Sequence, residues 1–151
     1  MAKEIERKFL VADESYRSMA IYKSEIVQGY LSINPDATVR VRINGDKAFI
    51  TVKSRNVGAV RNEWEYPVDP AEARQMLETC CQSRLIVKTR HVVPAENGLK
   101  WEIDEFHGEL DGLTIAEIEL PETESAFVIP PFIGEEVTGN PGYYNSVLSA
   151  I

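Results

Sequence analysis

The strongest constraint in this sequence is an alternation of apolar and polar residues that recurs in eight separate segments. Successive side chains of a β-strand point to opposite faces, so this period of two predicts strands with one apolar and one polar face. Most segments are bounded by Gly, Pro, Asn or Asp, which is typical of strand ends. The predicted strands cover residues 4–11, 26–33, 38–43, 48–55, 61–68, 85–92, 100–106 and 114–120.

Helix signals are few by comparison. The clearest follows Asp69, a suitable N-cap residue, with Pro70 at the first helical position. An apolar stripe at helical spacing then runs through Ala73, Met76, Leu77, Cys80 and Cys81. The adjacent cysteines are expected to belong to this stripe, because neighbours in sequence rarely form a disulfide and offer no metal spacing. With weaker helices near 13–20 and 143–150, the sequence predicts an α+β, mainly β fold in one domain, 1–151.

The dipeptide Asn44-Gly45 is a strong signal for a two-residue hairpin loop between the third and fourth predicted strands. Such a loop pairs residue 40 with residue 49, and residues paired across two strands share a face. A four-residue loop would keep the same parity. Arg40 and Arg42 are therefore expected to share their face with Phe49, Thr51, Lys53 and Arg55.

The polar face of these strands is almost entirely charged. Its basic residues are Lys8, Arg40, Arg42, Lys53, Arg55, Arg61, Lys88 and Arg90. Its acidic residues are Glu4, Glu6, Glu63, Glu65, Glu102, Asp104, Glu117 and Glu119. The signs are also sorted, with Lys and Arg on the third, fourth and sixth strands and acids on the first, seventh and eighth. A solvated outer face is the alternative, but surface charge that serves solubility is normally interspersed.

The net charge of −8 would by itself argue against a polyanionic ligand. The charged face, however, is neutral as a whole, so the acidic excess lies elsewhere on the chain. Basic runs with interleaved aromatic residues, typical of nucleic-acid binders, are absent from the sequence. No apolar stretch approaches the roughly 18 residues of a membrane helix, and the first residues lack an apolar export core. We expect a cytoplasmic protein with no nucleic-acid or membrane partner.

Clustered like charges need a counter-ion, since two unit charges about 4 Å apart repel by roughly 4 kcal/mol at an effective dielectric of about 20. A polyphosphate satisfies the basic cluster, because Arg binds phosphate oxygens bidentately and Lys supplies a point charge. A hard divalent cation satisfies the acidic cluster, and Mg²⁺ commonly binds through one or two carboxylates plus substrate phosphates. If the eight strands close into a barrel, this face points inward. An open cleft lined by the same residues is the alternative.

At these positions the chain resembles the CYTH superfamily, also called the triphosphate tunnel metalloenzymes. Residues 4–8, Glu-Ile-Glu-Arg-Lys, match the family's N-terminal E-x-E-x-K signature. Further matches follow in the family's order over essentially the whole chain: Gln28-Gly29-Tyr30-Leu31, Arg40-x-Arg42, Lys53, Glu63-x-Glu65, Lys88-x-Arg90, Asp104-x-Phe106 and Glu117-x-Glu119. One departure lies in the tail, where Gly142 precedes Tyr143-Tyr144-Asn145 and close relatives often carry a basic residue. A phosphate contact from the tail is therefore not expected.

The resemblance implies an eight-stranded antiparallel closed tunnel with a few flanking helices. It also implies a metal-dependent hydrolase that cleaves the terminal phosphate of inorganic triphosphate. By resemblance, Mg²⁺ or Mn²⁺ would be held by Glu4, Glu6, Glu117 and Glu119, with Glu63, Glu65 and Asp104 holding a second ion or orienting cations. The triphosphate would contact Lys8, Arg40, Arg42, Lys53, Lys88 and Arg90, and Arg55 and Arg61 on the same face complete the candidate binding set. The candidate catalytic residues are Lys8, Lys88 and Tyr30, although Tyr30 is equally well explained by packing.

Three other functions are compatible with the same residues: a thiamine triphosphatase, a class IV-like adenylate cyclase and a non-catalytic polyphosphate sensor. Inorganic triphosphate is favoured because little of the chain remains to build a pocket for a large organic group. His91 and His107 are expected to lie outside the site, and Trp64 and Trp101 in the core. The sequence leaves the preferred metal and the choice between monomer and homodimer open.

Overall fold

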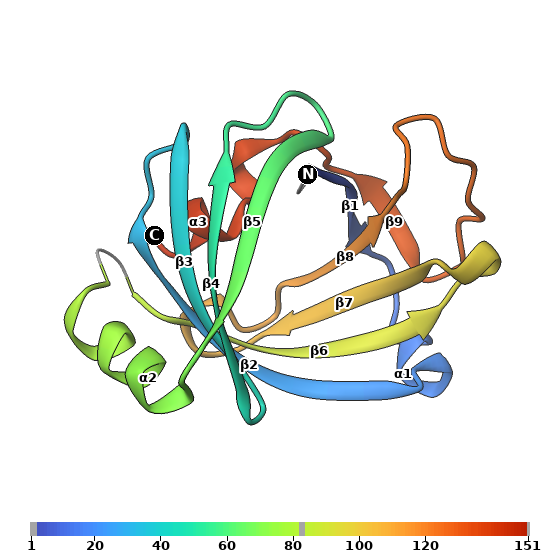
Figure 1. The fold of residues 1–151 in the computed structure, drawn as a ribbon. Coiled ribbons are helices and arrows are strands. Elements are labelled where there is room, and N and C mark those ends of the chain that lie inside the picture. The colour runs from blue at the N-terminus through green and yellow to red at the C-terminus, as the bar shows by residue number, and fades with distance from the viewer. Residues whose placement is uncertain (1–2, 82–83, 151) are drawn as a thin grey trace.

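The computed structural model describes residues 3–81 and 84–150, and Figure 1 shows its fold. The strands of this part are β1 (Lys3–Val11), β2 (Tyr22–Ser32), β3 (Ala37–Asn44), β4 (Lys47–Ser54), β5 (Val60–Val68), β6 (Ile86–Pro94), β7 (Lys100–Phe106), β8 (Thr114–Glu119) and β9 (Ile133–Glu136). The helices are α1 (Tyr16–Met19), α2 (Pro70–Thr79) and α3 (Asn145–Leu148). Short 3₁₀ turns are η1 (Glu96–Gly98), η2 (Gly108–Leu110) and η3 (Pro141–Tyr143). Each of the eight predicted strands is present, whereas β9 was not predicted. Among these described helices, none is long and apolar enough to cross a membrane.

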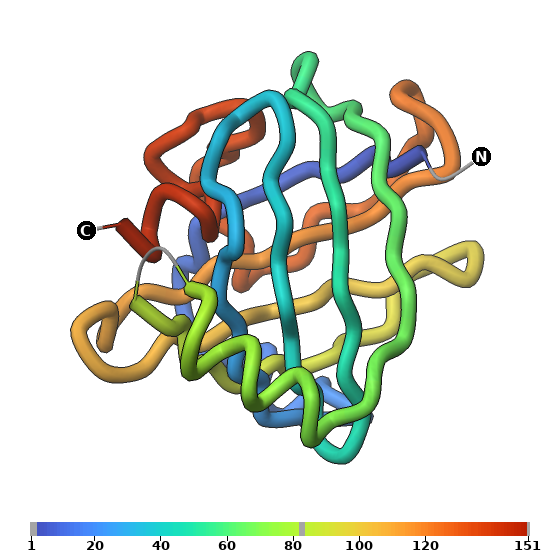
Figure 2. The backbone as a smooth tube through the Cα atoms, turned by 60° about the vertical axis from the view of Figure 1, so that its left-hand side comes forward, coloured from blue at the N-terminus to red at the C-terminus, as the bar shows by residue number. Residues whose placement is uncertain are grey.

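The sheet closes on itself through β1. Its strands follow the order β5-β4-β3-β2-β6-β7-β8-β1, every neighbouring pair is antiparallel, and β1 also pairs with β5. On β1, residues 3–5 pair with β5 and residues 6–10 pair with β8. The later part of β1 pairs with β9, which occupies the edge that β5 has left. The predicted closed eight-stranded barrel is confirmed, and the path of the chain around it can be followed in Figure 2.

The hairpin between β3 and β4 has the predicted parity but not the predicted register. Asn44 pairs with Lys47, so the loop consists of Gly45 and Asp46. Arg40 consequently lies opposite Thr51, two residues beyond the predicted partner. Gly45 takes the first loop position with a φ of 64°, a left-handed conformation that glycine adopts without a steric penalty. A register shift of two residues leaves every side chain on the same face of the sheet. Arg40 and Arg42 therefore still share their face with Thr51 and Lys53.

The apolar faces of the strands point outward, and the core therefore lies between the barrel wall and the elements that cover it. Helix α2 covers the outside of β2, β3 and β4, where Ala73 and Leu77 pack with Val41 and Ala48. Leu148 of α3 belongs to a second cluster with Ile86, Phe106 and Ile115. The largest cluster contains Ile5, Phe9, Tyr16, Val93, Trp101, Ile103, Ala116, Ile118, Leu120 and Phe132.

The two tryptophans differ in their surroundings. Trp101 is 1% exposed and lies in the largest cluster, as predicted. Trp64 is 38% exposed, so its assignment to the core was wrong. It lies on β5 opposite Val52 of β4. The apolar cluster beneath α2 includes Val68 on β5 but not Trp64, which therefore stays open to solvent.

The predicted start of α2 is confirmed. The Asp69 carboxylate accepts a hydrogen bond of 2.8 Å from the backbone N–H of Ala71, and Pro70 occupies the first turn. Cys81 packs with the apolar cluster beneath α2, as predicted. The assignment of Cys80 to the apolar stripe was wrong, because α2 ends at Thr79 and Cys80 is exposed. Both cysteines are free thiols, as expected.

Gly29 lies where the segment after α2 crosses the outer face of β2. A Cβ atom at this position would clash with Cys81 Sγ and would lie 2.8 Å from Leu85 Cδ2 and 3.1 Å from Leu77 Cδ2. A larger side chain would therefore push the α2 segment away from the wall. This close approach explains why position 29 in the Gln28-Gly29-Tyr30-Leu31 motif is a glycine.

We predict that Gly29→Ala lowers the free energy of unfolding by about 1–3 kcal/mol, the usual cost of overpacking a core. Urea denaturation at equilibrium measures the change. Removing the Cys81 sulfur relieves the nearest clash, so Gly29→Ala should cost less in a Cys81→Ala background than in the wild-type chain. Equal costs in the two backgrounds would contradict this account of Gly29.

Candidate functional site

The charged faces of the eight barrel strands enclose a cavity of about 200 Å³. Seven basic residues line it: Lys8, Arg40, Arg42, Lys53, Arg61, Lys88 and Arg90. Seven acidic residues also line it: Glu4, Glu6, Glu63, Glu65, Glu102, Glu117 and Glu119. The remaining lining residues are Tyr30, Thr38, Tyr144, Asn145 and Ser146. The interior is therefore charged but formally neutral, and the apolar core lies outside it.

The order of the strands sorts the charges in space as it does in sequence. The acidic strands β7, β8 and β1 are consecutive neighbours in the barrel. Glu6 lies opposite Glu119 across β1 and β8, and Glu102 lies opposite Glu117 across β7 and β8. The basic strands β4, β3 and β6 are separated only by β2. One side of the cavity is thus rich in carboxylates and the other in cations.

Two residues of the predicted site lie outside the cavity lining. Arg55 follows the end of β4, and its side chain is 62% exposed and bound to Asp36. The alternation of faces no longer applies there because the strand has ended.

Asp104 is fully buried behind the lining, where it accepts two hydrogen bonds of 2.8 and 2.9 Å from Arg90. Its second oxygen also lies 2.7 Å from Lys88 Nζ.

Both histidines lie away from the cavity, as expected. The His91 ring packs edge-on against Tyr16 of α1 and lies 3.3 Å from the Glu105 carboxylate. His107 Nε2 forms a hydrogen bond of 2.7 Å with the hydroxyl of Thr89. These contacts attach outer elements to the barrel wall.

Glu6 and Glu117 form a carboxylate pair in the acidic sector. Burial, together with the negative charges of Glu117 and Glu4, raises the pKa of Glu6 well above its ordinary value. Burial also opposes ionisation of Glu117, but Lys8 and a hydrogen bond from Glu6 hold the pKa of Glu117 well below its ordinary value. The two carboxylates therefore oppose each other's ionisation. A cation placed beside such a pair would be stabilised by their negative charge.

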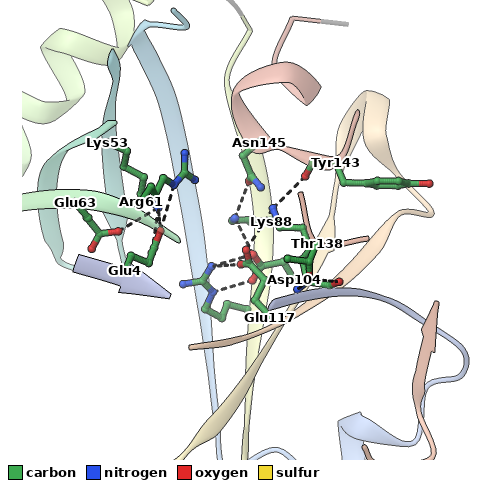
Figure 3. Close-up of polar contacts among 12 residues, drawn as sticks. Glu4, Lys53, Arg61, Glu63, Lys88, Asp104, Glu117, Thr138, Tyr143 and Asn145 are labelled. Carbon is green, nitrogen blue, oxygen red and sulfur yellow. Dashed lines mark hydrogen bonds and ion pairs between the residues drawn. The ribbon is translucent and has the colours of Figure 1, made fainter. Parts of the chain in front are cut away.

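Glu4 is the centre of a second charged cluster. Lys53 Nζ lies 3.1 Å from Glu4 and 3.1 Å from Glu63, and Arg61 Nε lies 3.4 Å from Glu4 (Figure 3). Burial would raise the pKa of Glu4, but Lys53 and Arg61 lower it to about 2. Burial and the neighbouring Glu4 raise the pKa of Glu63. The cluster thus pairs two cations with two carboxylates of unequal acidity.

Cations of the basic sector crowd one another inside the barrel. Burial, with the like charges of Arg40 and Arg90, lowers the pKa of Arg42. Burial also lowers the pKa of Lys88 to about 7, although Asp104 opposes the shift. Within the part of the chain that the structure describes, the buried Nε of Arg40 has no hydrogen-bond partner. These groups are arranged to receive an anion.

The C-terminal tail contributes three lining residues that the sequence did not predict, namely Tyr144, Asn145 and Ser146. Lys8 Nζ donates a hydrogen bond of 3.2 Å to the carbonyl of Tyr143 and lies 5.7 Å from the centre of the Tyr144 ring. Asn145 Oδ1 accepts a hydrogen bond of 2.9 Å from Lys88 Nζ. The Tyr143-Tyr144-Asn145 motif was visible in the sequence, but nothing in its spacing indicated that the tail reaches the tunnel.

The donors of the acidic sector are carboxylate oxygens, the ligand type that hard divalent cations prefer. No group of three or more His, Cys, Asp or Glu side chains in residues 3–81 and 84–150 forms a ready metal-ligand set. The carboxylates instead interact in pairs, Glu6 with Glu117 and Glu4 with Glu63. Mg²⁺ binds through one or two carboxylates when phosphate oxygens and water complete its shell. The donors therefore fit a divalent ion that is bound together with a phosphate ligand.

Comparison with known proteins gives a consistent match. The model of the CYTH domain matches residues 2–145. The inorganic triphosphatase of Acetivibrio thermocellus is 46% identical over 151 residues, which is 98% of this chain and 94% of that protein. The inorganic triphosphatase of Nitrosomonas europaea is 36% identical over 149 residues, 97% of this chain and 96% of that protein. A crystal structure of an inorganic triphosphatase superposes with a TM-score of 0.70 at 34% identity, covering 100% of this chain and 97% of the other.

We predict that Asp104→Asn destabilises the protein by about 3–5 kcal/mol, because it leaves Lys88 and Arg90 buried without their shared counter-charge. Equilibrium denaturation measures the loss. Glu102→Gln is the matched control, since the Glu102 side chain is 28% exposed and its contact with Arg90 is 3.4 Å long. That change should cost no more than about 1 kcal/mol. Equal effects of the two substitutions would contradict the structural role of Asp104.

Proposed function

The chain belongs to the CYTH family, and from that membership we propose that it is a metal-dependent hydrolase that cleaves the terminal phosphate of inorganic triphosphate. The observation that carries the proposal is the small, formally neutral cavity lined by seven cations and seven carboxylates, with carboxylates concentrated on β7, β8 and β1 and cations on β3, β4 and β6. Two relatives at 46% and 36% identity are named inorganic triphosphatase and support the same substrate.

The size of the cavity favours a substrate without an organic group. Pockets for drug-sized ligands usually measure about 300–1,000 Å³, and this cavity measures about 200 Å³. A nucleotide would have to leave its base and ribose outside the barrel. Inorganic triphosphate has the charge that the basic sector needs and no group that needs a further pocket.

The basic sector is proposed to hold the triphosphate. Arg40 and Arg42 of β3 can bind phosphate oxygens bidentately, and the partnerless Nε of Arg40 is available for one such bond. Lys8 and Lys88 supply point charges at the tail side of the cavity. We place Lys53, Arg61 and Arg90 in the same set, and we leave out Arg55 because its side chain lies at the exposed end of β4.

The acidic sector is proposed to hold Mg²⁺ or Mn²⁺ through Glu4, Glu6, Glu117 and Glu119, with Glu63 and Glu65 beside a second ion. When bound, the ion would polarise a phosphoryl oxygen and lower the pKa of an attacking water. Asp104 is left out of this set because it does not line the cavity, and its oxygens contact Arg90 and Lys88 at 2.7 to 2.9 Å. We assign it the role of fixing those two cations.

Phosphoryl transfer needs positioning and charge stabilisation more than a covalent nucleophile. We propose that Lys8 and Lys88 stabilise the charge that develops on the phosphate groups. Tyr30 is 5% exposed and lines the cavity, so its hydroxyl is the proposed proton donor to the departing pyrophosphate. The acidic excess of the chain lies outside the tunnel, which agrees with a cytoplasmic enzyme that does not bind nucleic acid.

The decisive experiment measures phosphate release from inorganic triphosphate, thiamine triphosphate and ATP with Mg²⁺, with Mn²⁺ and with a chelator. We expect the largest kcat/KM for inorganic triphosphate and no release with the chelator. A larger kcat/KM for thiamine triphosphate, or cyclic AMP formed from ATP faster than triphosphate is hydrolysed, would replace the proposed substrate. Tight triphosphate binding without phosphate release under either metal would instead indicate a sensor.

We predict that Glu4→Gln and Glu119→Gln each lower kcat/KM by more than the roughly hundredfold that loss of an outer-shell metal partner can cost. Both changes keep the shape of the side chain and remove only its charge. Circular dichroism and urea denaturation would verify that each variant is folded. Glu135→Gln, an exposed change on β9, is the matched control and should leave kcat/KM unchanged. Near-wild-type turnover in either tunnel variant would rule that glutamate out as a metal ligand.

A further inference from the structure

The ammonium group of Lys88 is held between two acceptors from different parts of the chain. Asp104 Oδ2 on β7 lies 2.7 Å from Lys88 Nζ, and Asn145 Oδ1 on α3 lies 2.9 Å from it. Figure 3 shows Lys88 between these two side chains. Lys88 is 1% exposed and its Nζ lies 5.3 Å from the centre of the Phe106 ring. The position of this ammonium group is therefore defined from two sides.

A lysine ammonium group has three N–H donors. Asp104 and Asn145 take two of them, and Lys88 also lines the cavity. Because the three N–H bonds are tetrahedrally arranged, fixing two of them fixes the direction of the third. The remaining N–H is thus available for a ligand in the tunnel.

The orientation of the Asn145 amide follows from its neighbours. Arg42 can only donate, and its Nε donates to Gln28 Oε1 at 2.8 Å. Gln28 therefore directs its Nε2 to Asn145 Oδ1, at 3.0 Å. Lys88 can also only donate, so both neighbours require the oxygen of Asn145 at the same position. Gln28 is fully buried, which makes a different arrangement of its amide costly.

We infer that Asn145 is a positioning residue for Lys88: its side-chain oxygen, with Asp104, aims the remaining N–H of Lys88 at the substrate in the tunnel. The inference rests on the proposed function, since it assigns Asn145 a role in triphosphate turnover. Through Gln28 the same amide is linked to Arg42, so that two cations on β3 and β6 are aligned by one tail residue. The C-terminal tail is thus part of the working site.

A purely structural role for Asn145 would be to attach the tail to the barrel. The tail has other attachments for that purpose. Leu148 is buried with Ile86 and Phe106, the backbone N–H of Arg84 donates to the Ser149 carbonyl at 3.2 Å, and Lys8 donates to Tyr143. Loss of the Asn145 side chain should therefore leave the tail in place and release only the amide contacts.

The test compares kcat and KM for inorganic triphosphate in Asn145→Ala, Asn145→Asp and Val147→Ala. Asn145→Ala should lower kcat by about tenfold to a hundredfold, as expected for loss of a hydrogen bond to a charged group, with a smaller change in KM. Asn145→Asp keeps both accepted hydrogen bonds and adds a negative charge beside the anion. It should retain most of kcat and raise KM by at least about tenfold.

Val147→Ala is the control, because Val147 lies on the same helix, is 40% exposed and does not line the cavity. It should leave both constants unchanged. Wild-type kcat in Asn145→Ala, or an equal loss of kcat in Asn145→Ala and Asn145→Asp, would overturn the inference. If Asn145→Ala fails to fold, the kcat of Asn145→Asp alone decides the question. Wild-type protein that releases no phosphate would instead refute the proposed function.

Discussion

The structure depends on one electrostatic constraint, which is that charge buried inside the barrel must be matched by opposite charge. Seven cations and seven carboxylates line a cavity of about 200 Å³. An unpaired ion in such a place would cost several kcal/mol. The strands that carry the two signs are therefore arranged so that Lys53 reaches Glu4 and Lys8 reaches Glu117. The closure of β5 onto β1 is what brings Arg61 to Glu4 and completes this balance.

The same constraint explains why the outer layer is needed. A barrel with a charged interior cannot be stabilised by an apolar core within it, so the hydrophobic area must be buried on the outside. Helix α2 covers one wall, and the loops that contribute Phe127 and Phe132 cover another. Where no element covers the wall, as at Trp64, the apolar face remains open. The close contact at Gly29 lies where α2 and its following segment press on the barrel.

Alternation in the sequence predicted the strands and the face of nearly every site residue, because a period of two is a local property of extended backbone. It failed for Arg55, where the strand ends and alternation loses its meaning. It placed Asp104 on the correct face but could not reveal that two cations cover it. The strand β9 and the reach of Asn145 into the tunnel depend on contacts between residues far apart in sequence. Alternation and spacing along the sequence do not indicate such contacts.

The charged groups that line the tunnel pair with one another, so binding of an ion there would exchange partners. Burial and the neighbouring carboxylates raise the pKa of Glu6, so its charge is disfavoured without a cation nearby, and Lys53 is bound by Glu4 and Glu63 where an anion could reach it. An anion that entered alone would displace carboxylates from their cations and leave them buried without partners. A cation that entered alone would compete with the lysines and arginines for the same carboxylates. Under the proposed function, a cation and an anion that entered together would each supply the partners that the other displaces, which would favour a metal–triphosphate complex over either component.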